Sequence, residues 1–398
     1  MTDSPGKKAL IFIEDGSFLL DNRVQREAGT LSRSGWQISV ICPRYPGEKR
    51  HDRQGPIHVY RYRKWTLGEG FIGHVFEYAS ALLKGGALSL WVFLRHGFRV
   101  FHACNPPDIL FLLGNIYKIF GVRFLFDHHD LCPELYLSRF KNPVPLVHKA
   151  LSWMERMTLK SADVVIATNQ TYRRIEMERG SVSPDRIFVV RNGPDTGKFK
   201  PGPADPALAA MGKTIVGYLG NMNPQDGVDF LVRAAHYLKE TGKGDDLYFV
   251  FVGGGDANEE LKGLSLSLGL EGICRFTGRL PDAEMLAVLN ACDICVQPDP
   301  SNPLNDASTM NKVMEYMALA KPVVAFDLPE TRTSGGEAAL YAEPNRLEDL
   351  AEKIRLLADH PELRRRLGEL GRRRLEEHLC WKHSEDPLLK AYEACLQG

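Results

Sequence analysis

Short apolar runs that alternate with helical segments limit the folds open to this chain more than any other feature. Residues 8–13 form an apolar run, and residues 24–34 have the pattern of a helix that Gly35 would end. Residues 36–42 form the next apolar run. A strand, a helix and a second strand in this order predict a parallel sheet with helices on both faces.

The alternation stops once and then resumes. Residues 196–212 are dominated by Pro, Gly and Ala, and a new apolar run begins at 213–220. A chain of 398 residues is also long enough for two domains. We therefore expect two doubly wound, Rossmann-like α/β domains at 1–195 and 213–375, which face each other across a cleft. Residues 196–212 would be the linker, and 376–398 a final helix.

Composition excludes several classes of function. Fifty basic and fifty acidic residues cancel, so no overall field attracts nucleic acid, and no nucleic-acid-binding motif is present. The eight cysteines are dispersed. Cys292 and Cys295 form a CxxC, but no second pair stands at zinc spacing, so we expect buried thiols and no metal. Free thiols, no signal-peptide layout and no run of eighteen apolar residues predict a cytoplasmic chain.

The stretch 306–326 carries the strongest signal for a binding site. It predicts a polar loop, a helix that begins near Asn311 or Lys312 and is stopped by Pro322, and a buried strand at 323–326. Lys312 and Glu315 lie in the first turn and a half, where unsatisfied N–H groups and the helix dipole favour anions. A lysine there suits phosphate, and a carboxylate one turn later suits two vicinal hydroxyls. The alternative is an ordinary charged pair on a surface helix.

This stretch resembles a known family. The sequence NKVMEYMALAKPVVAF is similar to the donor-nucleotide helix of the family-4 retaining glycosyltransferases, which have the GT-B fold. The resemblance implies that Glu315 holds the nucleotide ribose and that the final helix at 376–398 crosses back to the first domain. Many members carry an earlier glutamate where this chain has Ala307, next to Asp306. Members that act on lipid-linked bacterial glycans can instead carry a lysine at the position of Lys312.

A second resembling segment follows the apolar run 122–126 and reads DHHDLCPELY. The resemblance places His129 near the donor sugar and acceptor, with His128 pointing to the opposite side if the strand continues. Asp130 and Glu134 would orient the two histidines. A histidine fits a polar cleft because it can donate, accept or shuttle a proton near neutral pH. The alternative is that either histidine bonds only to loop backbone.

Acceptor contacts are expected from the loop 14–23. Ligands of parallel sheets bind at the carboxyl ends of strands, which brings Asp21, Asn22 and Arg23 to the cleft. Together with His128 and Asp130, Asp21 and Arg23 form our acceptor-side set. The alternative for Asp21 and Asn22 is that they cap the following helix.

Donor contacts are expected from several loops of the second half. Glycine turns begin at Gly220 and at Gly253-Gly254, and such turns let the backbone approach a phosphate. The family often has an arginine and a lysine where this chain has Asn221 and Asp226, so the positive charge would come from Lys312, Arg279 or Arg332. The full donor set is Gly220, Asn221, Gly253, Gly254, Arg279, Leu280, Thr309, Asn311, Lys312 and Glu315.

The stretch 71–98 is aromatic and aliphatic, contains Gly85 and Gly86, and has basic residues at both ends. Such a helix can lie in a membrane interface. The alternative is a core helix that packs on the sheet.

The resemblance implies a glycosyltransferase that moves a sugar from a UDP- or GDP-sugar to a glycan or polyprenyl-linked acceptor, with retention. It would work in cell-surface polysaccharide synthesis, without metal or cofactor, in the cytoplasm or on the membrane periphery. His129, Lys312 and Glu315 would be the catalytic residues. The alternatives are a sugar-nucleotide epimerase of the same fold and an inactive scaffold protein.

Overall fold

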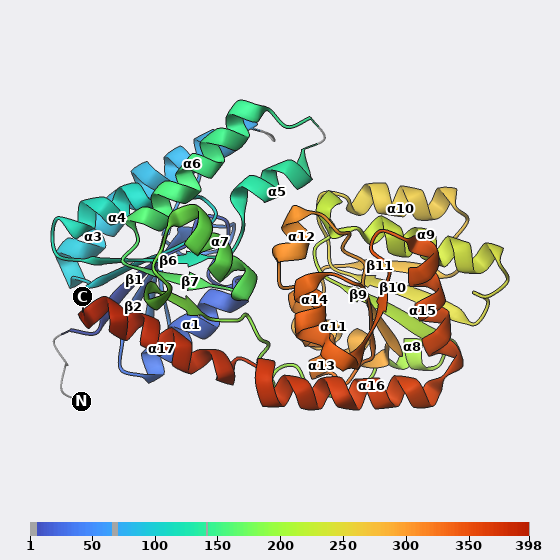
Figure 1. Cartoon of the computed structure of the whole chain (residues 1–398). Coiled ribbons are helices and arrows are strands. Elements are labelled where there is room, and N and C mark those ends of the chain that lie inside the picture. Colours follow the sequence, from blue (N-terminus) through green and yellow to red (C-terminus); the bar gives the residue numbers. More distant parts are fainter. Residues whose placement is uncertain (1–5, 66–70, 141, 398) are drawn as a thin grey trace. The chain divides into compact units, whose positions relative to one another are not determined.

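The computed structural model describes residues 6–65, 71–140 and 142–397, which belong to two compact units. The first unit contains Met1–Arg191 and Ser384–Gly398, and the second contains Asn192–His383. Residues 196–212, which the composition marks as a linker, lie within the second unit. Each unit is built around one sheet (Figure 1).

The first sheet has eight strands in the order β3-β4-β2-β1-β5-β6-β7-β8. Neighbouring strands pair in parallel except for β3 and β4. Their bounds are β1 Lys8–Phe12, β2 Gln37–Pro43, β3 His51–Gln54, β4 Ile57–Tyr62, β5 Val100–Cys104, β6 Arg123–His128, β7 Val164–Ala167 and β8 Ile187–Val189. The predicted parallel sheet is therefore confirmed for this half of the chain.

Helices cover both faces of the first sheet. Figure 1 shows α1 and α17 on one side and α3, α4 and α6 on the other. The bounds are α1 Asn22–Arg33, α2 Phe71–Ser80, α3 Gly86–His96, α4 Phe111–Lys118, α5 Cys132–Arg139, α6 Pro145–Ser161, α7 Gln170–Gly180 and α17 Lys382–Gln397. Within the unit, Trp36 packs edge-on against Tyr392 of α17, with ring centroids 4.9 Å apart.

The stretch 71–98 forms α2, a π-helical turn at Ala81–Gly85 and α3. Its inner side packs closely on the sheet. A Cβ on Gly85 would overlap the ring of Phe12, which belongs to β1. Val92 is also fully buried. The core-helix alternative is therefore correct for this side. No helix among the described residues is long and apolar enough to cross a membrane.

The second sheet has six parallel strands in the order β11-β10-β9-β12-β13-β14. Their bounds are β9 Thr214–Leu219, β10 Leu247–Val252, β11 Cys274–Gly278, β12 Ile294–Gln297, β13 Val323–Phe326 and β14 Ala339–Ala342. Apolar side chains fill a core on both of its faces. This topology makes both units α/β, as the alternation of the sequence predicts.

The helices of the second unit connect these strands or precede and follow them in the chain. They are α8 Pro206–Ala209, α9 Val228–Glu240, α10 Asn258–Ser267, α11 Asp282–Ala291, α12 Pro303–Ala307, α13 Asn311–Ala318, α14 Pro329–Gly335, α15 Leu347–Asp359 and α16 Pro361–Arg374. Helix α13 begins at Asn311, as predicted. The expected loop 299–306 instead contains most of α12, because Asn302 caps the backbone N–H groups of Leu304 and Asn305. All eight cysteines are free thiols.

Candidate functional site

The carboxyl ends of four neighbouring strands converge in the second unit. Gly220 directly follows β9, Gly253 follows β10 and Arg279 follows β11, while Asp299 lies two residues beyond β12. In parallel sheets these ends share one edge, which is where ligands bind. The predicted residues Gly220, Gly253 and Arg279 therefore lie at the same edge of the sheet.

The backbone of the first two turns is packed without room for side chains. The N–H of Gly220 donates to the carbonyl of Val252 (3.0 Å), and that of Gly253 donates to the carbonyl of Gly278 (3.0 Å). Gly253 has a φ of +130°, and a Cβ on it would overlap the carbonyl oxygen of Gly220. Backbone contact therefore requires glycine at position 253, whereas at position 220 the φ of +149° favours glycine.

Helix α13 is fixed beside these strand ends by a residue that sequence reasoning missed. The fully buried hydroxyl of Tyr316 accepts a hydrogen bond from the N–H of Leu219 (2.7 Å) and donates to the carbonyl of Val296 (3.3 Å). It therefore ties α13 to β9 and β12. The hydroxyl gave no signal in the sequence, because its position within an apolar helix face predicted only packing.

Lys312, in the first turn of α13, forms a buried ion pair. Its Nζ lies 3.0 and 2.8 Å from the two carboxylate oxygens of Asp299, and their side chains are only 10% and 1% exposed. The ammonium also lies 5.1 Å from the ring centroid of Tyr218. Asp299 was not predicted as a site residue, yet it holds the lysine in place. A Cβ on Gly220 would lie 3.2 Å from Cε of Lys312, so the lysine stem runs along the glycine turn.

The remaining donor candidates differ in exposure. Thr309 and Glu315 are half-buried, whereas Asn221, Asn311 and Arg279 are exposed. Leu280 is half-buried, and the Arg279 stem passes 3.8 Å from where a Cβ on Gly254 would be. Arg332, offered as a source of positive charge, instead pairs with Asp327 at 2.5 Å on the surface.

A second polar cluster lies at the carboxyl end of β6 in the first unit. Asp127 accepts hydrogen bonds from Nη2 of Arg23 (2.8 Å) and Nε2 of His129 (2.6 Å). Arg23 also donates to the carbonyl of Val190 (2.9 Å) and pairs with Glu27 at 3.0 Å. Only His129 in this cluster is partly exposed, at 18% for its side chain.

The ionisation of this cluster follows from its charges. Burial opposes charge on Asp127, but Arg23 and His129 outweigh it and hold the pKa of Asp127 well below its usual value. Burial also opposes charge on His129, and the Asp127 carboxylate overcomes both burial and the nearby Arg23 to raise the pKa of His129 to about 9. His129 is therefore an imidazolium at neutral pH, rather than a group poised to exchange a proton there.

The residues predicted to contact the acceptor have different roles in the structure. Arg23 is 5% exposed and engaged by Asp127, so its guanidinium serves the cluster. Asp21 caps α1 by accepting from the N–H groups of Arg23 and Val24, as in the capping alternative. Asp130 is half-buried, and its N–H donates to Asn105, which also receives the N–H of His129.

His128 points away from His129 into the protein. It is fully buried, and its Nδ1 lies 3.1 Å from a carboxylate oxygen of Glu176. Burial opposes its charge, but Glu176 and Glu155 raise its pKa to about 9. Glu134, expected to orient the histidines, pairs with Arg179 instead (2.5 Å).

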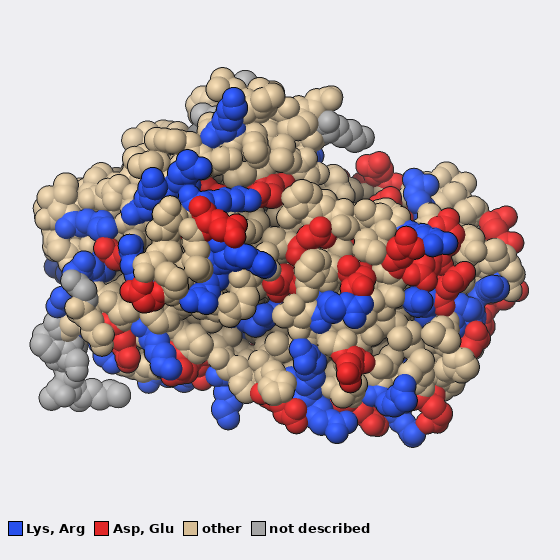
Figure 2. All heavy atoms as spheres, viewed as in Figure 1, with Lys and Arg blue, Asp and Glu red and all other residues tan. Residues whose placement is uncertain are grey.

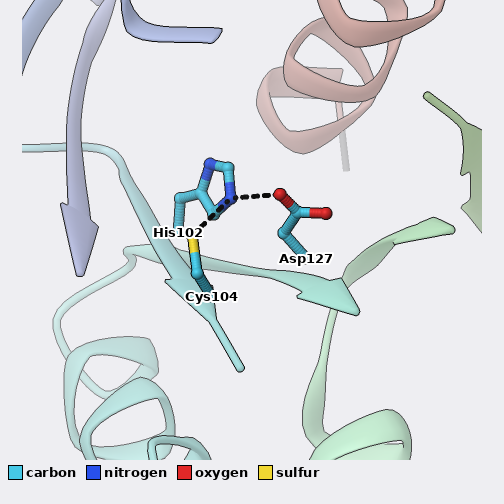
Figure 3. A group of neighbouring side chains, drawn as sticks. All are labelled: His102, Cys104 and Asp127. Atoms are coloured by element: carbon cyan, nitrogen blue, oxygen red, sulfur yellow. Dashed lines mark hydrogen bonds and ion pairs between the residues drawn. The ribbon is translucent and has the colours of Figure 1, made fainter. Parts of the chain in front are cut away.

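His102, Cys104 and Asp127 form a buried group of side chains (Figure 3). Nε2 of His102 lies 3.5 Å from Asp127 and 3.6 Å from Cys104, while its Nδ1 lies 2.7 Å from the hydroxyl of Tyr392. Such an arrangement offers ligand atoms for a metal ion, as do Glu27, Asp127 and His129. In both groups Asp127 is already paired with Arg23, and burial raises the pKa of the Cys104 thiol. We therefore describe these residues as one buried polar network.

Comparison with protein families gives two matches. Residues 20–193 match the model described as glycosyl transferase 4-like domain. Residues 213–360 match the model described as glycosyl transferases group 1. Together the two matches span most of the chain, one in each unit.

The curated relatives are named as glycosyltransferases or as a sugar-phosphate synthase. The chain is 30% identical to alpha-maltose-1-phosphate synthase of Mycolicibacterium smegmatis over 62% of its own length and 66% of the relative's. It is 27% identical to D-inositol 3-phosphate glycosyltransferase of Rhodococcus erythropolis over 68% of its length and 62% of the relative's. The chain thus spans slightly less than two thirds of these relatives.

Solved structures share the fold across nearly the whole chain. Sucrose-phosphate synthase from Thermosynechococcus elongatus superposes with a TM-score of 0.80, at 18% identity, over 98% of this chain and 99% of that one. HepE of Anabaena, solved with UDP-glucose, superposes with a TM-score of 0.72, at 16% identity, over 97% and 99%.

Proposed function

Because the chain belongs to the group 1 glycosyl transferases, with the GT-B fold, we propose that it transfers a sugar from a nucleotide-diphosphate sugar to an acceptor hydroxyl. The observation that carries the proposal is the strand-end edge of the second unit. There, the glycine turns at Gly220 and Gly253 lie beside a helix that carries Lys312 and Glu315. The family implies that the anomeric configuration is retained.

The nucleotide would bind at this edge. The glycine turns after β9 and β10 would let the diphosphate approach the backbone, and the N-terminus of α13 would face it with N–H groups. Glu315, one turn into the helix, would accept from the two ribose hydroxyls. Arg279 and Leu280, after β11, would contact the base through their backbone.

Lys312 would act on the leaving group. Negative charge grows on the diphosphate as the glycosidic bond breaks, and a fixed cation lowers the energy of that transition state. Two oxygens of Asp299 hold the ammonium, so its position is set before the substrate arrives. In the first unit, the His129 imidazolium would donate a hydrogen bond to a substrate oxygen, since Asp127 keeps it charged.

The donor and acceptor are proposed from neighbouring proteins. HepE was solved with UDP and with UDP-glucose, so a UDP-sugar is the first donor to test, with GDP-sugars next. For the acceptor we propose a glycan or polyprenyl-linked sugar of cell-surface polysaccharide synthesis, reached from the cytoplasmic side of the membrane.

A thermal-shift panel tests the donor site. Nucleoside diphosphates and their sugars are added to the wild-type protein, to Glu315→Ala and to Glu369→Ala, which removes an exposed carboxylate of α16. We expect one base to stabilise the wild type and Glu369→Ala but not Glu315→Ala. Absence of a shift with every nucleotide would instead favour the inactive scaffold.

Donor turnover then separates transfer from epimerisation. The stabilising sugar nucleotide is incubated with the protein, with and without simple glycan acceptors, and the products are separated. A transferase forms a new glycoside only with acceptor. Conversion of the donor to its epimer without acceptor would replace the proposal with the epimerase.

A further inference from the structure

Many of the exposed large apolar side chains of the first unit lie on one helical layer. We define the α3–α4–α6 surface as the outward side of these three helices and of the residues directly after α4. Its exposed apolar residues are Leu90, Trp91, Leu94, Leu112, Ile116, Ile119, Phe120, Leu146 and Trp153. Three of them, Leu94, Ile119 and Leu146, are 75–80% exposed. An apolar area of this extent on a folded domain usually marks a contact with another molecule or a membrane.

The three helices lie side by side, so this surface is continuous. The ring of Phe93 in α3 lies 5.5 Å from that of Tyr117 in α4 and 5.8 Å from that of Phe120. The ring of Phe111 in α4 lies 6.4 Å from that of Trp153 in α6. Figure 1 shows the same succession of helices along one face of the first sheet.

The charge on this surface has one sign. Helices α3 and α4 contain no aspartate or glutamate, and the one carboxylate of α6, Glu155, is fully buried. Basic side chains are exposed at Arg95, Lys149, Arg156 and Lys160. Lys118 at the end of α4 is half-buried and paired with Asp163. The chain as a whole carries equal numbers of acidic and basic residues, so this separation is local. Over α6, Figure 2 shows basic side chains among uncharged ones.

From this surface we propose that the first unit docks on a membrane that contains anionic lipid. Apolar tips that enter the interface and basic side chains that reach lipid phosphates are what such binding requires. Trp91 and Trp153, about half exposed, have the amphipathic ring that favours the interfacial region. The helices have 11, 8 and 17 residues and lie along the sheet, which suits binding in the plane of the interface.

Charge also argues against a second copy of the chain as the occupant. A two-fold dimer places the same patch of each copy against the other. Here that would oppose basic side chains to basic side chains with no exposed carboxylate on the three helices to compensate. An anionic partner resolves this conflict, and lipid headgroups present anions over a whole plane.

This inference rests on the proposed function and deepens it. A polyprenyl-linked acceptor lies in a membrane, so a protein docked there would be close to its acceptor. The inference also extends the membrane contact predicted from sequence at 71–98 to α4 and α6. The inner side of that stretch packs on the sheet, and six of the nine exposed apolar residues lie in α4, directly after it or in α6. Their exposed residues were not singled out, because exposure depends on how the helices pack.

Vesicle flotation tests the inference with matched variants. The charge variant is Lys149→Gln/Arg156→Gln/Lys160→Gln, and its control is Arg365→Gln/Arg366→Gln/Arg373→Gln on α16. The apolar variant is Leu94→Ser/Ile119→Ser/Leu146→Ser, and its control is Met211→Ser/Leu266→Ser/Leu356→Ser in the second unit. Vesicles are phosphatidylcholine alone or mixed with phosphatidylglycerol.

We expect wild type and both controls to float with the anionic vesicles, with binding that weakens as salt rises. Removing three basic residues should lower the partition coefficient by about 100-fold. The apolar variant should also lose binding. Equal binding to both vesicle types, unchanged binding of the charge variant, or absence of binding by the wild type would overturn the inference. The inference would also be overturned if the wild type sedimented as a dimer and the apolar variant sedimented as a monomer.

The nucleotide thermal shift, measured on the same samples, keeps the two proposals distinct. Loss of vesicle binding with an intact nucleotide shift contradicts only the membrane inference. An absent nucleotide shift in a protein that still floats contradicts only the proposed function.

Discussion

The imidazole of His129 lies 2.6 Å from the carboxylate of Asp127, at the carboxyl end of β6. This ion pair makes His129 a fixed cation at neutral pH, because Asp127 raises its pKa to about 9 against the effects of burial and Arg23. The residue therefore suits a role as a charged hydrogen-bond donor to substrate more than a role as a proton shuttle.

This ion pair predicts how stability depends on pH. The pKa of His129 is about 6.5 in the unfolded chain and about 9 in the folded one, so its charge stabilises the fold fully below pH 6.5. That contribution is lost as pH rises through 9. At about 1.4 kcal/mol per pKa unit, up to about 3 kcal/mol disappears over this window. Urea unfolding of wild type and His129→Gln between pH 6 and 10 measures it.

His128 titrates in the same window and is present in both proteins, so its effect cancels in the difference. We expect the gap in unfolding free energy between wild type and His129→Gln to narrow as pH rises from 6.5 to 9. A gap that stays constant would show that His129 is uncharged in the folded protein.

Glu315 gives a prediction on nucleotide affinity. If its carboxylate accepts two hydrogen bonds from ribose, Glu315→Ala loses roughly 1–2 kcal/mol for each, or roughly 30- to 1000-fold in dissociation constant. Titration calorimetry with the nucleoside diphosphate from the thermal-shift panel measures this loss. Glu369→Ala serves as the control and should bind like wild type. Unchanged affinity in Glu315→Ala would refute the ribose contact.

Lys312 and Asp299 are expected to behave as a unit. Lys312→Met leaves a buried carboxylate without its cation and should lower the unfolding free energy by about 3–5 kcal/mol. Asp299→Asn/Lys312→Met removes both charges and should recover most of that stability. Chemical denaturation compares the three proteins.

Binding distinguishes structure from function in the same variants. The double variant should bind the nucleoside as wild type does but bind the nucleoside diphosphate more weakly, because only the diphosphate needs the cation. Equal losses for both ligands would mean that the pair only maintains the fold.

Gly253 tests the packing of the strand-end turns. Gly253→Ala introduces a Cβ that overlaps the carbonyl of Gly220 at a φ of +130°, so the thermal midpoint should fall and nucleotide binding should weaken. Gly263→Ala is the matched control, since its Cβ would meet no atom within 4 Å in the interior of α10. That variant should gain up to about 1 kcal/mol from helix propensity. A Gly253→Ala protein as stable as wild type would contradict the close approach.

Much of the fold could be read from the sequence because it depends on local patterns. Alternating apolar runs predicted parallel sheets in both units, and the predicted start of α13 at Asn311 is correct, although its N-cap is Met310 and it ends at Ala318, before Pro322. The contacts that set the site depend on residues distant in sequence. Asp299 holds Lys312 from 13 residues away, and Arg23 reaches Asp127 across 104. Contacts between residues so far apart in the sequence produce no periodic pattern. The sequence therefore predicted a ligand contact for Arg23 and no role for Asp299.

The first unit is assembled from two parts of the chain that are separated by the whole second unit. Tyr392 of α17 packs on Trp36 and bonds to His102, which lies 290 residues earlier. During synthesis, the ribosome makes nearly all of the second unit before it makes α17. Until α17 is synthesised, the surface of the nascent first unit that α17 covers, which includes Trp36 and His102, therefore lacks its partner residues. Its maturation is timed by translation of the second unit, and a pause in that interval would prolong its exposure to chaperones and proteases.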